Sequence, residues 1–292
     1  MKQQDMYKIL AFFLAFTMIF SIFAYIFINP QDNTQQQTED QTQTYYDPEF
    51  WTFDQPFDSI SDALNITPSG AESASYVNLE KMAPQMAAWA RQAQPVLNEV
   101  DTIYNSTTTK MYYSDIKSSG NFSFLLLSTM DPLKNDFQYI FIDSYYDHPL
   151  LVRQEGGLQG FYNVMGTPVI LAPPRTVIDV IDITMSLNET VTSYDEYKGM
   201  LNLVPYAPFQ TITSNVTFAK QFYMGVDQNN ESYERTTGYL DVNSSVMKKL
   251  SQLKTNSTQK RFSQYNITKT GNYTIVKVSG QDMYTVLMEE VN

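Results

Sequence analysis

Few side chains in this sequence could carry out covalent or metal chemistry. The 292 residues include a single histidine, His148, and no cysteine, so multi-histidine and thiolate zinc sites are excluded. No G-x-S-x-G stretch exposes a serine nucleophile. Because Asp147 and Pro149 flank His148, we favour a turn residue over a general base at this position. The sequence therefore predicts no catalytic residue, no metal site and no cofactor.

Paired carboxylates are the remaining candidates for acid–base catalysis or calcium binding. Asp179 and Asp182 form one such pair, and Asp143 and Asp147 form another. The segment 227–231 resembles part of a calcium loop but lacks its glycine and terminal glutamate spacing. In a chain with 31 Asp and Glu residues such pairs arise freely, so we favour solvated carboxylates.

Modification chemistry is better represented than catalysis. Ten of the nineteen asparagines begin an Asn-x-Ser/Thr triplet, the acceptor for N-linked glycans. This is about threefold more than chance would place there. The ten candidate glycosylation sites are Asn65, Asn105, Asn121, Asn188, Asn215, Asn230, Asn243, Asn256, Asn266 and Asn272.

A membrane anchor precedes all ten triplets. Residues 9–28 are twenty consecutive uncharged, mostly apolar residues, and twenty residues at helical rise span a bilayer core. Lys2 and Lys8 precede the run, and only acidic charges follow it at first, which predicts a cytoplasmic N-terminus. The exit lacks the small residues of a cleavage site, so we favour an uncleaved anchor over a cleaved signal or a buried core helix. The rest of the chain is then extracytoplasmic.

Composition limits the partners of the outer part. Residues 30–292 carry 17 Lys and Arg against 30 Asp and Glu, a formal charge of −13. This charge repels phosphate backbones and anionic head groups, so we expect no nucleic acid and no lipid contact beyond the anchor. Without cysteine, stability must come from packing and not from disulfides. Acidity, triplet density and the anchor together resemble the membrane-anchored surface glycoproteins of archaea. This is a resemblance of type, and it implies a cell-envelope location.

The outer part begins with a polar linker, residues 29–44, rich in Gln, Thr, Asn and acids. An abruptly aromatic stretch, residues 45–57, marks the start of the folded part. We interpret this stretch as a segment packed on the core, with a patch for docking a partner as the alternative.

An internal repeat lies in the folded part. Three blocks recur at an offset of 151 or 152 residues, and order and spacing are kept between them, which favours a tandem duplication. The pairs of blocks are residues 56–61 with 208–213, 105–107 with 256–258, and 120–123 with 271–274.

Each copy shows a helical pattern followed by strands around a Gly-Asn turn. The predicted helices are residues 82–103, with a kink at Pro95, and residues 246–253. In the first copy a strand that ends at Lys117 is followed by strands over residues 122–127 and 137–142. In the second copy a strand that ends at Lys269 is followed by strands over residues 273–278 and 284–288. Residues 161–165, 169–171 and 181–187 are predicted as further strands between the copies. The predicted fold class is α+β: a transmembrane helix followed by two tandem helix-plus-antiparallel-sheet modules, residues 45–150 and 206–292, joined by connecting strands in 151–205.

The leading functional hypothesis is a single-pass, membrane-anchored extracytoplasmic glycoprotein that is not an enzyme. It would span the bilayer through residues 9–28, carry N-linked glycans, and contact an envelope or membrane protein. An extracytoplasmic solute-binding or sensor domain, with its site between the modules, is the alternative. A carboxylate-based hydrolase is a third, weaker hypothesis.

Overall fold

A computed structural model describes residues 50–118, 121–134, 137–154, 158–186, 191–229 and 232–288. The predicted cytoplasmic N-terminus (residues 1–8), anchor (9–28) and linker (29–44) lie outside the described residues. Within the described ranges, no helix has the length and apolar character needed to cross a bilayer.

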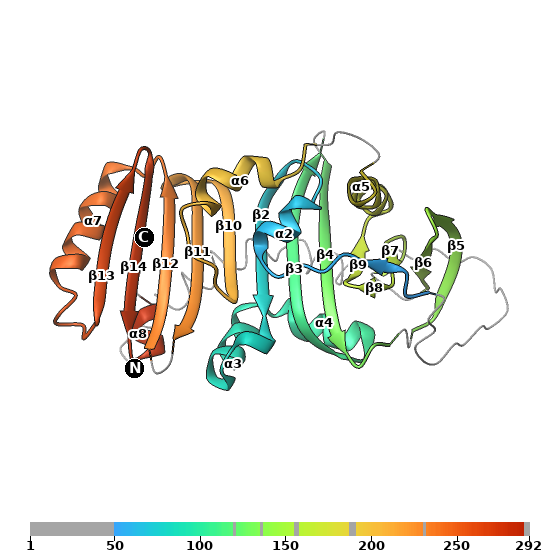
Figure 1. Ribbon diagram of the computed structural model, residues 1–292, viewed down its shortest axis with the longest axis horizontal. Helices are drawn as coiled ribbons and strands as arrows, with labels where there is room; N and C mark the ends of the chain where they lie inside the picture. Colours follow the sequence, from blue (N-terminus) through green and yellow to red (C-terminus); the bar gives the residue numbers. More distant parts are fainter. Residues whose placement is uncertain are drawn as a thin grey trace.

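The described strands form one long antiparallel sheet with β13 and β5 at its two ends (Figure 1). A separate parallel pair joins β1 (Phe53–Asp54) to β8 (Gly166–Thr167). In sheet order the twelve strands are β13 (Gln264–Thr270), β14 (Tyr273–Gly280), β12 (Ser232–Leu240), β11 (Ala219–Asn229), β10 (Phe209–Val216), β2 (Ala71–Asn78), β3 (Thr107–Ser118), β4 (Asn121–Asp131), β9 (Val169–Ala172), β7 (Tyr162–Val164), β6 (His148–Arg153) and β5 (Tyr139–Tyr145).

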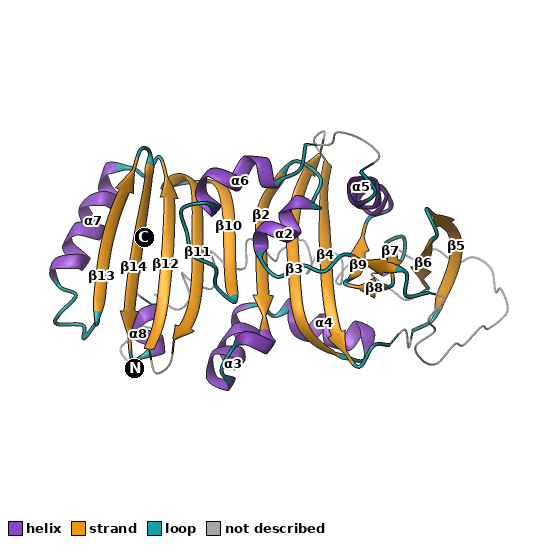
Figure 2. Cartoon of the chain, viewed as in Figure 1, coloured by secondary structure: helices purple, strands orange, loops and turns teal. Residues whose placement is uncertain are grey.

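Helices pack on both faces of this sheet, which confirms the α+β class (Figure 2). Successive strand residues point to opposite faces, so Tyr112 and Tyr113 of β3 belong to different buried clusters. Residues of α2 (Ile60–Asn65), α5 (Pro174–Thr184) and α6 (Tyr194–Leu201) join the Tyr112 cluster, and those of α3 (Pro84–Ala93), α4 (Val96–Tyr104) and α8 (Met283–Leu287) join the Tyr113 cluster. A third cluster joins α7 (Ser244–Thr255) to β13 and β14, and a short 3-10 turn, η1 (Leu79–Lys81), follows β2.

Two predicted strands are wrong, because most of what the structure describes of each segment is helical. Residues 181–187 were predicted as a strand, but residues 181–184 are the end of α5, which begins at Pro174, and residue 187 lies outside the described residues. Residues 284–288 were also predicted as a strand, but they belong largely to α8, whose cap Asp282 accepts a hydrogen bond from the backbone N–H of Thr285. In both helices the buried positions follow i, i+3, i+4 spacing. Each segment is a short apolar run, and periodicity alone does not tell a helix from a strand in such a run.

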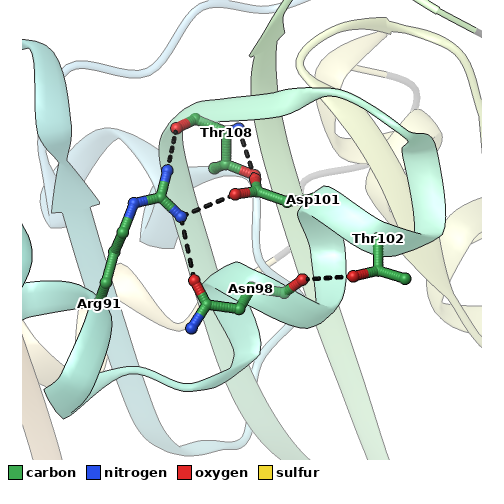
Figure 3. Close-up of polar contacts among 5 residues, drawn as sticks. All are labelled: Arg91, Asn98, Asp101, Thr102 and Thr108. Atoms are coloured by element: carbon green, nitrogen blue, oxygen red, sulfur yellow. Dashed lines mark hydrogen bonds and ion pairs between the residues drawn. The ribbon is translucent and has the colours of Figure 1, made fainter.

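The predicted helix over residues 82–103 is two helices, α3 and α4, separated at Gln94 and Pro95 rather than kinked there. Arg91 of α3 bridges the break, donating to the carboxylate of Asp101 at 2.7 Å and to Asn98 Oδ1 at 3.3 Å (Figure 3). The other Asp101 oxygen accepts the backbone N–H of Thr108 at 2.6 Å. This network ties both helices to the start of β3.

The two predicted modules share one sheet. Both contain a helix followed by a hairpin, α4 with β3–β4 and α7 with β13–β14. However, the neighbour of the hairpin differs. In the first module β2 pairs with the first hairpin strand, β3, whereas in the second module β12 pairs with the second hairpin strand, β14. The first repeated block also differs, because Phe57 precedes a helix whereas Phe209 begins β10, which pairs directly with β2. The duplication therefore stays a prediction, and the helix–hairpin unit is the part that both copies share.

A buried carboxylate lies in the centre of the sheet. Asp115 of β3 is 8% exposed and accepts hydrogen bonds from Tyr113 Oη at 2.6 Å and Ser73 Oγ at 2.7 Å. Burial raises the pKa of Asp115, although these two hydrogen bonds act in the opposite direction.

We expect Asp115→Asn to be at least as stable as the parent protein at pH 7. The unfolded carboxyl group loses its proton near its ordinary pKa of 3.8, whereas the folded group keeps its proton to higher pH. Stability is therefore lost as pH rises from 3.8 through the folded pKa, and the amide avoids this loss. Urea unfolding at several pH values should show the variant's advantage shrinking on acidification. The exposed Asp54→Asn is the control, and an advantage that grows on acidification would contradict the prediction.

Candidate protein-contact site

The edge strand β5 presents apolar side chains to solvent. It pairs with β6 alone among the described strands, and five of its seven residues are exposed. Ile140, Phe141 and Ile142 are 43%, 51% and 49% exposed. Edge strands offer a row of unpaired N–H and C=O groups to another chain, and proteins normally protect them with charges, proline or β-bulges. The residues of β5 include one charged side chain, Asp143.

The opposite edge strand, β13, has a different character. Its exposed residues are polar and include Gln264, Asn266, Thr268 and Lys269. Asn266 is also a predicted glycan acceptor. A lysine and a glycan acceptor are both features that discourage strand addition, so the two ends of the sheet are not equivalent.

The β5–β6 hairpin is held in place by its turn and by α5. Tyr146 and Asp147 have φ values of 46° and 64°, the left-handed pair that a two-residue hairpin turn requires. The hydroxyl of Tyr145 donates to the carboxylate of Asp182 on α5 at 2.7 Å. A β-bulge between Phe141 and Asp143 shifts the register against β6. The exposed strand is therefore fixed on the body of the protein.

The N-terminal aromatic segment packs beside this hairpin. The Phe50 ring lies 5.6 Å from the Tyr139 ring of β5, centroid to centroid. His148, the first residue of β6, shares a hydrogen bond of 2.9 Å between its Nδ1 and Thr52 Oγ1, and its ring meets Phe53 edge-on. Burial lowers the pKa of His148. The chain thus reaches the folded part next to β5, and His148 helps to hold it there.

The two carboxylate pairs singled out in the sequence lie on or near the same hairpin, whereas Asp227 of the segment 227–231 lies on β11. Asp143 accepts the adjacent backbone N–H at 2.8 Å, and Asp182 accepts from Tyr145. Burial raises the pKa of Asp179, one helical turn before Asp182. In the part of the chain that the structure describes, no three His, Asp or Glu side chains cluster as a metal site would require. These contacts give Asp143 and Asp182 structural roles.

The described glycan acceptors lie at helix ends, in the turn at Asn272 and on strands β4, β10 and β13. Asn188 and Asn230 lie outside the described residues, and the side chain of Asn121 is not described. The other seven acceptor side chains are exposed: Asn65, Asn105, Asn215, Asn243, Asn256, Asn266 and Asn272. Their exposure is compatible with modification, which stays a prediction.

No acceptor triplet begins between Asn121 and Asn188. This interval contains β5 to β9 and α5, at the end of the molecule opposite α7 and β13 (Figure 1). The sequence contained this signal, because the gap can be seen by inspection. The sheet order is needed to show which surface lacks predicted acceptors.

Comparisons with known proteins do not assign the chain to a family. The sequence matches no known family model and no curated protein. Among solved structures, crystal form I of TP0453 aligns with a TM-score of 0.44 and 8% identity, covering 77% of this chain and 96% of that one. Crystal form III of TP0453 aligns with a TM-score of 0.41 and 9% identity, covering 80% and 99%. At these values the likeness supports no conclusion about function.

Proposed function

We propose that this protein is a single-pass, membrane-anchored extracytoplasmic glycoprotein without catalytic activity. Its folded part makes protein contacts in the cell envelope or with a membrane complex, and β5 is the contact site. The observation that carries this proposal is the apolar edge strand at Ile140–Ile142, in the interval without acceptor triplets.

Strand addition suits β5 better than contact with lipid. An added strand satisfies the free backbone N–H and C=O groups of the edge, and its side chains cover the exposed apolar residues. Hydrocarbon would cover the same side chains but leave the backbone groups without hydrogen-bond partners, at a cost of several kcal/mol for each group. A partner with its own free edge is therefore favoured.

The position of β5 also suits a partner in the same membrane. Phe50, the first described residue, contacts Tyr139 of the edge strand and follows the predicted linker closely in the sequence. A flexible chain with the length of the predicted linker, residues 29–44, has a root-mean-square span of about 20–24 Å. This keeps β5 close to other proteins anchored in the bilayer.

A glycan placed on β5 tests the proposal. Ile142→Asn creates an Asn-Asp-Ser acceptor with Asp143 and Ser144. In a host that glycosylates the chain, the added sugar should block the edge and abolish cross-linking to the partner in native membranes. The matched control is Ile142→Gln, which adds a polar side chain without an acceptor and should keep most of the cross-link. A glycosylated Ile142→Asn chain that still cross-links normally would overturn β5 as the contact site.

The solute-binding alternative has less support. An open hollow of about 590 Å³ lies between α7 and β13, lined by Met247, Ser251, Lys254, Thr255, Ile267 and Lys269. It lies within the second predicted module and not between the two. We therefore rank solute binding, and hydrolysis by the carboxylates near β5, below protein contact.

A further inference from the structure

The acidic chain contains a basic region near its C-terminus. Residues 242–281, which include α7, β13 and β14, hold seven Lys and Arg residues and no Asp or Glu. The rest of the chain holds 12 Lys and Arg residues against all 31 Asp and Glu residues. Positive charge is therefore concentrated at the end of the sheet opposite β5 (Figure 1).

The open hollow between α7 and β13 lies within this basic region. Its α7 wall is one face of the helix, because the lining residues follow i, i+4, i+7, i+8 spacing. They are Met247, Ser251, Lys254 and Thr255. The β13 wall is Ile267 and Lys269, two residues apart and so on one face of the strand. Each wall thus offers one ammonium group and one apolar side chain.

Both ammonium groups are free to meet a ligand. Lys254 and Lys269 are exposed, and neither forms an ion pair with a residue that the structure describes. By contrast, Lys277 of β14 lies 3.5 Å from the carboxylate of Glu234 on β12. Among the described residues that line the hollow, none is acidic. The hollow therefore attracts negative charge.

We propose that this hollow binds an acidic, extended segment of another protein, in which carboxylates alternate with apolar side chains. The carboxylates pair with Lys254 and Lys269, and the apolar side chains pack on Met247 and Ile267. This second contact surface does not depend on the proposed role of β5. The match of charge and apolar surface across the hollow carries the inference.

The hydroxyl groups of α7 suit the backbone of such a segment. Ser251 Oγ donates to the Met247 carbonyl, and Thr255 Oγ1 donates to the Ser251 carbonyl, both at 3.0 Å. Each hydroxyl oxygen can still accept a backbone N–H from the segment.

The segment crosses the hollow without extending the sheet. Adjacent strand residues point to opposite faces, so the predicted acceptor Asn266 is directed away from the face that carries Ile267. A glycan on Asn266 therefore blocks the free edge of β13 but leaves the hollow accessible.

The shape of the hollow favours a protein segment over other anions. An open hollow covers too little of a small solute, because solute sites normally enclose most of the ligand. A chain that crosses it adds several weak contacts. An acidic polysaccharide would place hydroxyl groups against Met247 and Ile267 without hydrogen-bond partners.

Binding of a fluorescent peptide to the full chain in nonionic detergent tests the inference. The probe has seven residues of alternating Glu and Val, the length of β13. It should bind above the level of empty micelles, and added salt should weaken the binding because the charges are exposed. Lys254→Glu combined with Lys269→Glu should weaken it about tenfold. The matched control is Arg175→Glu with Lys220→Glu, which changes the net charge equally at exposed positions and should bind like the parent.

The nature of the ligand is tested with further probes. A peptide of alternating Glu and Ser should bind several-fold more weakly, because it lacks the apolar contacts, and equal binding would overturn the proposed pattern. Displacement of the probe by less polygalacturonate than unlabelled peptide, at equal carboxylate concentration, would identify a polysaccharide as the ligand instead. Displacement by phosphatidylglycerol added to the micelles would identify a lipid headgroup.

Two results would overturn the basic hollow as a binding site altogether. They are binding no stronger than to empty micelles, and equal weakening by the two double variants. Because every variant leaves β5 unchanged, these results would not affect the proposed function.

Discussion

Replacing Arg153 with methionine should lower the free energy of unfolding by about 3 kcal/mol. Arg153 is only 2% exposed, and its guanidinium lies 3.7 Å from the Phe137 ring centroid and 4.9 Å from that of Tyr104. Its Nη2 donates to the backbone carbonyl of Ile103 in the last turn of α4 at 2.8 Å. Methionine fills much of the same space but removes the charge. The Ile103 carbonyl then loses this donor, at about 1–3 kcal/mol, and the desolvated cation–π contacts, about 2 kcal/mol, are lost.

Urea unfolding of the full chain in detergent measures this loss. The control is Arg175→Met on the exposed first turn of α5, which should change stability by less than about 0.5 kcal/mol. Arg153→Lys should fall between the parent and methionine, because an ammonium keeps the charge without the planar stack. Equal losses for Arg153→Met and Arg175→Met would contradict a specific role for the buried guanidinium.

Arg153 also connects stability to the contact site. It ends β6, the strand that carries β5, and pairs with Tyr139 in the sheet register. Through Ile103 it ties this hairpin to α4. The exposed, bulged strand β5 keeps its place because its neighbour β6 is attached to the core.

Local signals in the sequence predicted the hairpins well. Apolar runs on either side of Gly-Asn correspond to β3–β4 and β13–β14, and further apolar runs correspond to β5, β7 and β9. The information needed for each hairpin lies within a few residues of its turn, which is why a single sequence was sufficient.

The centre of the sheet was missed. β2 and β10 are rich in Ser, Thr and Gln, so they lack the apolar alternation of a half-buried strand. Their polar side chains are satisfied by distant partners. Gln210 of β10 accepts the backbone N–H of Ile60 and donates to Tyr223 Oη, both at 3.0 Å. A partner 150 residues away leaves no local pattern, so these strands could not be predicted from spacing.

The candidate site was predicted only in pieces. Residues 137–142 were predicted as a strand and residues 45–57 as a packed aromatic segment. Phe53 is indeed buried, whereas Phe50 and Trp51 are half-buried against the core. That β5 is an edge, and that Phe50 lies beside it, depends on the order of twelve strands. That order is set by long-range pairing, which no motif in the chain encodes.

Gly166→Ala should detach the N-terminal segment from the fold at a cost of about 1–3 kcal/mol. A Cβ at Gly166 would lie 2.1 Å from the backbone oxygen of Phe53 and 2.6 Å from its Cβ. Backbone atoms on the opposing strand cannot rotate away, so β1 must separate from β8. Limited proteolysis should then cut residues 50–55 faster than in the parent. The control is Gly280→Ala, whose nearest neighbour is a side-chain methyl group of Val286 at 3.2 Å, so that only a small shift is needed. Equal protection of both variants would contradict the prediction.

The same variant separates the strand from the segment that leads to it. Release of β1 breaks the Thr52–His148 and Phe50–Tyr139 contacts but leaves β5 paired with β6. The edge stays exposed and apolar, while residues 50–55 are no longer held beside it. In membranes, Gly166→Ala should therefore reduce cross-linking of β5 to its partner without abolishing it. Complete loss of the cross-link would mean that the aromatic segment itself forms part of the contact surface. An unchanged yield of the cross-link would mean that the position of this segment does not influence the contact at β5.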